Sequence, residues 1–341
     1  MTTSLRIHKQ ILEVPFIFLL SWLFFVGQPG QLSAQGIPDR LRPISFKPVL
    51  DFTDQTVTLE ERVLEMSRIG FRELGNDNFK IQDYRERIDK MAKELSGRLQ
   101  GSPKNKINVI NQYLFRELGF QIDPSDLLTT PLSGLLMNQV IDKKRGTCLT
   151  MSILYLALGQ HLNLPFYGVQ VPGHFFVRYD DGKEQINIET TRQGEMLPDD
   201  YYLQTYFYGQ KSQSKYLKNL NDREVVAVYL SNLGNQYKMK GLYDRAIDIL
   251  GYALDLAPDF PAIVTNLGNA YERKGEVGQA ILEYTIAIGM NPYLCEAHYN
   301  LGLAHFIYTK NEKYARLHGQ IAQQLGCSMA PQFVQFLNSK P

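Results

Sequence analysis

The chain has 341 residues, with 36 basic and 35 acidic side chains and a formal net charge of +1. This balance gives no electrostatic support for a nucleic-acid partner, and a hydrophobic content of 44% excludes a disordered chain. The length is sufficient for two or three domains. Cys148, Cys295 and Cys327 are too few for a disulfide framework and lack metal-ligand spacing, so we expect no such framework, no metal and no cofactor.

The first 34 residues have the composition of a secretory signal peptide. Basic residues at positions 6, 8 and 9 precede an apolar run over Val14–Val26, and Leu32-Ser33-Ala34 fits a cleavage site. The run is shorter than the roughly 20 residues of a membrane span, and an uncleaved anchor is the alternative. We therefore expect an exported protein, periplasmic or extracellular, that contacts a membrane only if residues 1–34 stay attached.

The region that follows is predicted to be a short tether and then a group of helices. Residues 35–54 contain prolines and no periodicity, which is typical of a tether. Apolar residues then recur at helical spacing in four stretches, Leu59–Ile69, Tyr84–Leu99, Ile107–Leu118 and Thr129–Lys144. These helices are expected to pack over the domain that follows, so their apolar stripes have a structural role.

A further helix is predicted to begin at Cys148. Apolar residues at helical spacing follow the cysteine, and Thr147 is a candidate N-cap. The N-terminus of a helix carries a partial positive charge and favours the thiolate, which is the form of a thiol that attacks carbonyls. Cys148 is therefore a candidate nucleophile, and a buried structural cysteine is the alternative.

Two strands of a hairpin are predicted after this helix. They cover His174–Tyr179 and Gln185–Thr190, and an Asp-Gly pair at 181 and 182 is a strong turn signal between them. With a two-residue turn there, the numbers of paired residues sum to 363. This register places His174 directly opposite Glu189, with their Cβ atoms roughly 5 Å apart.

Such an arrangement predicts a catalytic triad of Cys148, His174 and Glu189. A carboxylate can hold one imidazole nitrogen while the other faces the thiol, which combines nucleophile, base and orienting group. A slip of the register by one residue would turn Glu189 to the other face, and Asn187 is then the alternative orienting residue. A histidine that merely packs in the hairpin is the competing interpretation for His174.

The stretch from about Asn108 to Asp199 resembles the transglutaminase-like superfamily. The likeness lies in INQYLFRELGF, in the RG before the cysteine helix, and in LYLALGQHLNLP and PGHFFVRY. Within the superfamily it most resembles the bacterial SirB-type group, in which such a domain precedes tetratricopeptide repeats. Many members of that group lack the cysteine, whereas GTC at 146–148 resembles the active transglutaminase and cysteine-peptidase pattern. The resemblance implies a Cys-His-Asp triad order, with Glu189 where Asp is usual.

Residues Gln193–Asn221 are rich in aromatic side chains and show no periodicity. Tyr or Phe occupies positions 201, 202, 206, 207, 208 and 216. We interpret the stretch as an irregular, packed connector between two domains, because aromatic rings contribute large buried areas at interfaces. The rim of a substrate cleft is the alternative interpretation.

The last third of the chain is an internal repeat with a period of 34 residues. The triplet Asn-Leu-Gly occurs at 232–234, 266–268 and 300–302, and this period is typical of tetratricopeptide repeats. We expect an all-α solenoid over 225–341, with copies at 227–260 and 261–294, a degenerate copy at 295–328, and a C-terminal capping helix near Gln332–Leu337. His298 and His305 fall on packing positions, which favours packing over a metal pair.

The sequence therefore predicts an α+β, papain-like transglutaminase-like domain over 55–210, with a helical N-terminal part, followed by the repeats. The leading function is a secreted cysteine-dependent enzyme that transfers acyl groups from peptide or protein amides, as a peptidase, deamidase or transglutaminase. The concave face of the repeats would dock the protein substrate or a partner. The alternative is a non-catalytic scaffold that binds peptides or proteins with the same two folds.

Overall fold

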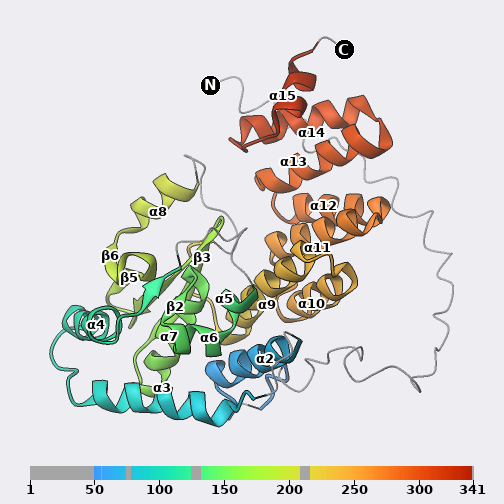
Figure 1. Cartoon of the computed structure of the whole chain (residues 1–341). Coiled ribbons are helices and arrows are strands. Elements are labelled where there is room, and N and C mark those ends of the chain that lie inside the picture. Colours follow the sequence, from blue (N-terminus) through green and yellow to red (C-terminus); the bar gives the residue numbers. More distant parts are fainter. Residues whose placement is uncertain (1–49, 55, 74–77, 124–131, 208–215, 340–341) are drawn as a thin grey trace, which may run out of the picture. The chain divides into compact units, whose positions relative to one another are not determined.

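A computed structural model of the chain describes residues 50–54, 56–73, 78–123, 132–207 and 216–339 (Figure 1). Residues 45–341 form one compact unit. The predicted signal peptide at 1–34 and most of the predicted tether at 35–54 lie outside the described residues. Within the described ranges, no helix has both the length and the apolar composition that crossing a membrane requires.

Short amphipathic helices form the first part of this unit. They are α2 (Leu59–Glu73), α3 (Ile81–Ser96), α4 (Pro103–Asn111), α5 (Leu132–Leu135) and α6 (Met137–Lys143), with a π-helical turn η3 (Gln112–Glu117) after α4. The helical stretches expected from periodicity are confirmed, but two of them are each divided into two elements. Helices α2 and α3 pack against α7, which follows them in the chain (Figure 1).

Helix α7 (Cys148–His161) lies at the centre of this helical part. Thr147 caps this helix. Its hydroxyl accepts a hydrogen bond from the backbone N–H of Thr150, and the hydroxyl of Thr150 accepts one from the backbone N–H of Thr147. The residues from Cys148 to Gly159 are all buried, as expected for a helix that is apolar on every side. The prediction of a helix that begins at the cysteine is confirmed.

A four-stranded antiparallel sheet packs against α7. Its order is β3 (Phe166–Val171), β4 (His174–Asp180), β5 (Gln185–Glu189) and β6 (Glu195–Leu197), and a short parallel pair, β1 (Gln121–Ile122) and β2 (Arg145–Gly146), precedes α7. Gly159 permits the close approach of helix and sheet, since a Cβ there would lie 2.4 Å from the Phe166 ring.

The predicted register of the hairpin is wrong by two residues. Asp180 pairs with Gln185 and Val177 with Ile188, so paired numbers sum to 365 instead of 363. The loop is longer than predicted because an oxygen of Asp181 accepts the amides of Lys183 and Glu184 and stabilises a four-residue turn. A shift of two residues leaves each side chain on its predicted face, because the side-chain period of a strand is two.

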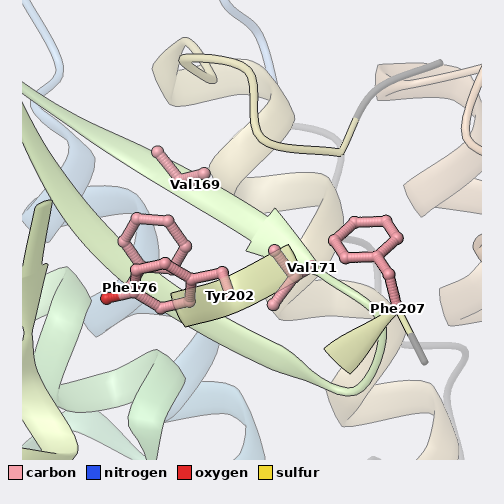
Figure 2. Packing of buried hydrophobic residues seen from close by; sticks show 5 residues of the cluster. All are labelled: Val169, Val171, Phe176, Tyr202 and Phe207. Carbon is pink, nitrogen blue, oxygen red and sulfur yellow. The ribbon is translucent and has the colours of Figure 1, made fainter. Parts of the chain in front are cut away.

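The prediction of an irregular backbone over 193–221 is wrong, because this stretch contains β6 and helix α8 (Asp199–Tyr206). The packing of its aromatic rings is confirmed. Figure 2 shows Tyr202 lying against Phe176 of β4, next to Val169 and Val171 of β3 and to Phe207. These rings bury one face of the sheet and fix α8 upon it.

Helices occupy all of the secondary structure after residue 221. They are α9 (Asp222–Met239), α10 (Tyr243–Leu256), α11 (Pro261–Lys274), α12 (Val277–Met290), α13 (Cys295–Ala304), α14 (Glu312–Gln324) and α15 (Pro331–Asn338), with a π-helical turn η5 (His305–Thr309). The first six pack as three pairs of neighbours, as the 34-residue period predicts, and the continuous described range 225–325 contains no strand. Phe333 and Leu337 bury α15 as the expected capping helix.

Cys295 and Cys327 form one disulfide, a pairing that the sequence analysis did not predict. Cys295 begins α13, and Cys327 follows the end of α14. Because neighbouring helices joined by a short turn run in opposite directions, these two points meet although 32 residues separate them. Cys148 is the free cysteine, and it is buried.

His298 is buried in the repeats, as its predicted packing position implies, and its partner is His318. Nδ1 of His298 lies 3.0 Å from Nδ1 of His318 on α14, and Nε2 of His298 donates to the carbonyl of Pro292. Burial lowers the pKa of His298 to about 4, so the ring is neutral at pH 7. His305 lies in η5, where its Nδ1 is 2.9 Å from the hydroxyl of Thr309 and its ring packs on Tyr314 of α14.

We predict that His161→Ala destabilises the packing of α2 on α7. Glu60 of α2 is 1% exposed, and His161 contacts it at 2.7 Å while its second nitrogen lies 3.1 Å from Asp89 of α3. Removing the imidazole leaves a buried carboxylate without its partner, which costs about 3 kcal/mol in the free energy of unfolding. Denaturant titration measures this loss, and Glu60→Gln in the same chain should restore part of it. If His161→Ala lowers the free energy of unfolding no more than Asp89→Asn does, the role of the His161–Glu60 pair is contradicted.

We predict that replacing both Cys295 and Cys327 by Ser lowers the free energy of unfolding by about 2–4 kcal/mol, because the cross-link restricts the unfolded chain. Thermal unfolding of the wild type with and without a reductant measures the same loss. Ser328→Ala, beside the disulfide, is the matched control. Equal stability of reduced and oxidised wild type would show that the bond does not form.

Candidate active site

The thiol of Cys148 and the imidazole of His174 meet where α7 and β4 begin. Cys148 is the first residue of α7, and His174 is the first residue of β4 with a side chain that is 7% exposed. The sulfur of Cys148 and the imidazole line one cavity, and an interaction with Cys148 is among the causes that raise the pKa of His174. In the first turn of α7 the N–H group of Thr150 is held by the Thr147 cap, whereas those of Cys148 and Leu149 have no acceptor within the helix.

Glu189 holds the other side of the imidazole. Its Oε2 lies 2.8 Å from Nε2 of His174, which leaves Nδ1 as the nitrogen available to the thiol. Its Oε1 accepts both the amide and the hydroxyl of Thr191 in the short 3-10 helix η4 (Thr190–Arg192). Glu189 lies diagonally across the strands from His174, and the length of the Glu side chain closes this distance.

Two opposing effects set the pKa values of the pair. Burial lowers the pKa of His174, but the hydrogen bonds with Cys148 and Glu189 outweigh burial and raise it to about 9. Burial also raises the pKa of Glu189, but the contacts with His174 and Thr191 outweigh it and lower the pKa below its usual value. Both shifts favour an imidazolium beside a carboxylate at neutral pH.

Contacts between α7 and η4 fix the cysteine relative to the carboxylate. The hydroxyl of Thr190 lies 3.1 Å from that of Ser152 on α7 and 3.5 Å from the carbonyl oxygen of Cys148. Thr190 is the neighbour of Glu189 in the chain, so one residue ties the helix that carries the thiol to the strand that carries the carboxylate.

Asn187, the alternative orienting residue, does not contact the imidazole. It pairs with Arg178 across β4 and β5 and accepts the Nε of Arg178 at 2.7 Å. Its amide nitrogen donates to Asp199 and to the carbonyl of Leu197. Asn187 therefore belongs to a structural network that joins the sheet to α8.

Tyr206 is a neighbour of the site that the sequence did not single out. Its ring is stacked on the imidazole of His174, with centroids 4.7 Å apart and an angle of 1° between the planes. The signal that could have indicated it is the Tyr202 and Tyr206 pair, four residues apart, which places both rings on one side of a helix.

A cavity of about 750 Å³ adjoins the thiol and the imidazole. Its lining includes Cys148, His174 and Pro172, together with residues from α9, α11 and α13, which are the first helices of the three repeats. We call it the shared cavity. Amide side chains recur on its repeat wall, namely Asn232, Asn235, Gln236, Asn266, Asn269 and Asn300. Burial lowers the pKa of Lys238 on this wall to about 8.

Cys295, Glu296 and Cys327 are a group of potential metal ligands whose donor atoms converge among the described residues. The two sulfurs are joined in the disulfide, so they cannot ligate a metal in this state.

Residues 82–231 match the family model of the transglutaminase-like superfamily. This transglutaminase-like domain contains Cys148, His174 and Glu189, and its end lies within α9. The match starts later and ends later than the predicted boundaries of 55 and 210.

Similar proteins extend this comparison. The chain is 25% identical over 227 residues to a UPF0162 protein of Xylella fastidiosa (strain 9a5c), covering 61% of this chain and 75% of that protein. It is 27% identical over 158 residues to F-box only protein 21 of Homo sapiens, but this covers 44% of this chain and only 24% of that protein. The crystal structure of menin, which reveals its binding site for Mixed Lineage Leukemia protein, is similar with a TM-score of 0.53 at 13% identity. That likeness covers 82% of this chain and 70% of menin, and it is a likeness of fold.

We predict that the fold loses stability in alkali through His174. The folded pKa of about 9 exceeds the unfolded value of about 6.5, so the stabilisation is complete below about pH 6.5 and is lost as the pH rises through 9. The loss is on the order of 3 kcal/mol. Denaturant titrations of the wild type and of His174→Gln at about pH 6 and pH 10 measure it as a difference between the two proteins. Parallel pH dependence in both would contradict the raised pKa.

Proposed function

We propose that this protein is a secreted, cysteine-dependent enzyme that transfers acyl groups from amides of peptides or proteins. The observation that carries the proposal is that Cys148 and His174 line the shared cavity together, while Glu189 bonds to the imidazole of His174 at 2.8 Å. This arrangement combines a nucleophile, a base and an orienting carboxylate. We further propose a papain-like arrangement of the domain and membership of the SirB-type group.

The chemistry follows from the positions of these three groups. The thiolate of Cys148 attacks the amide carbonyl, and the free N–H groups at the start of α7 stabilise the oxyanion. The imidazolium of His174 gives its proton to the departing amine, which leaves a thioester on the sulfur. Water or a second amine then attacks the thioester, His174 takes the proton of that nucleophile, and the sulfur leaves as the thiolate with which the cycle began. Glu189 holds the ring and stabilises its positive charge throughout.

The shared cavity supports a protein or peptide substrate. Asn and Gln side chains both donate and accept hydrogen bonds, as does a peptide backbone, and they recur along the repeat wall. A polypeptide bound on the repeats would lie in the same cavity as the thiol. A docking role for the repeats therefore belongs to the proposal.

Export is also proposed, and the disulfide supports it. Disulfides persist in oxidising compartments and are rare in the cytosol of most organisms, so Cys295–Cys327 fits a periplasmic or extracellular protein. The signal-like start of the chain favours the same location. Mass spectrometry of the protein from its native host, which should begin near Gln35, tests this part.

We predict that Cys148 reacts rapidly with iodoacetamide below pH 7, because the positive charges of the imidazolium and of the helix start favour attack by its sulfur. Mass spectrometry of the labelled full chain gives the rate. His174→Ala should slow labelling at pH 6, and Tyr167→Phe, on the sheet surface away from the site, is the matched control. With β-casein as a probe amide donor, Cys148→Ala should lose activity by about 10³-fold or more, and Glu189→Gln by a smaller factor.

A thiol that labels only in alkali, together with unchanged activity in Cys148→Ala, would contradict the proposed cysteine-dependent acyl transfer. The same result combined with peptide binding in the shared cavity would favour the alternative, a non-catalytic scaffold.

A further inference from the structure

The ring of Tyr206 lies parallel to the His174 imidazole and covers one of its two faces. The parallel planes and the centroid distance of 4.7 Å describe an offset stack. Hydrogen bonds to Glu189 and Cys148 fix the ring through its edge, but bonds along the edge leave the ring faces uncovered. Tyr206 covers one of these faces.

The placement of Tyr206 is set by two contacts of α8. In the first turn of α8, the carboxylate of Asp199 accepts hydrogen bonds from Arg178 of β4 at 2.6 Å and from the side-chain amide of Asn187 of β5 at 2.8 Å. One turn before its end, Tyr202 stacks on Phe176 with centroids 3.8 Å apart (Figure 2). The two strands that carry His174 and Glu189 therefore also carry the anchors of α8.

The chemistry of the stacked ring fits a cation. The face of an aromatic ring attracts positive charge, and the attraction is greater where water is excluded. Burial and the nearby charge of Glu189 raise the pKa of Tyr206, so the phenol stays neutral while the imidazolium forms. The other titratable or charged groups near this ring are Cys148 of α7, Arg192 of η4, and Tyr201 and Tyr202 of α8.

We propose that Tyr206 is a positioning residue of the proposed acyl transfer, whose ring face holds His174 in place and stabilises its imidazolium form. The inference rests on the proposed function. It adds a fourth residue to the site, which acts through His174 and not on the substrate, and it gives a role to α8.

The test replaces the ring of Tyr206 in the full chain while its shape is kept. Tyr206→Phe retains the electron-rich face, and pentafluorophenylalanine at the same position reverses the polarity of the face. The readout is the pH profile of Cys148 labelling by iodoacetamide, with thermal unfolding as the check on the fold. The Phe variant should retain the wild-type profile, and the fluorinated variant should label about 3- to 10-fold more slowly at pH 6. Tyr201→Leu, on the same helix but away from the imidazole, is the control.

The outcomes separate the two claims. A reactive wild-type thiol with the same profile in the fluorinated variant overturns the role of Tyr206 and leaves the proposed function intact. A wild-type thiol that does not label below pH 7 overturns the proposed function and this inference with it. Tyr206→Leu extends the test, because loss of the stack must slow labelling at least as much as fluorination does.

Discussion

The burial of Glu189 is the constraint on which the geometry of the site depends. A carboxylate with 1% exposure stays ionised only where donors satisfy its oxygens. His174 approaches one oxygen, and the amide and hydroxyl of Thr191 satisfy the other, so the ends of β4, β5 and η4 have to keep fixed positions. The imidazole in turn contacts Cys148 at the capped start of α7. A single buried charge thereby couples the sheet, the short 3-10 helix and the central helix.

The sequence predicted those parts whose signal is local or periodic. The all-round apolar character of the helix after Cys148 and its Thr147 cap predicted α7, and the 34-residue period predicted the helix pairs. The alternation of the strands predicted that His174 and Glu189 share a face, and this survived an error of two residues in the register. The error arose because the Asp181 side chain stabilises a longer loop, which the Asp-Gly signal does not distinguish from a two-residue turn.

The remaining parts depend on contacts between distant residues. The disulfide between Cys295 and Cys327 requires the antiparallel packing of α13 and α14, which the spacing of the cysteines does not indicate. Tyr206 reaches His174 only because Asp199 binds Arg178 and Asn187 on the sheet. The shared cavity likewise joins residues of α7 and β4 to helices more than 50 positions later in the chain. Tertiary packing, and not local preference, brings the proposed docking surface to the thiol.

The central claim is that His174 is an imidazolium held between the sulfur of Cys148 and the carboxylate of Glu189. Nitrogen NMR of the histidine rings in the labelled full chain measures this charge state directly, with His174→Gln to assign the signal. The account predicts an imidazolium at pH 7 that loses its proton near pH 9, and a lower titration midpoint in Cys148→Ser and Glu189→Gln. A neutral His174 ring at pH 7 in the wild type, titrating near its ordinary value of about 6.5, would contradict it.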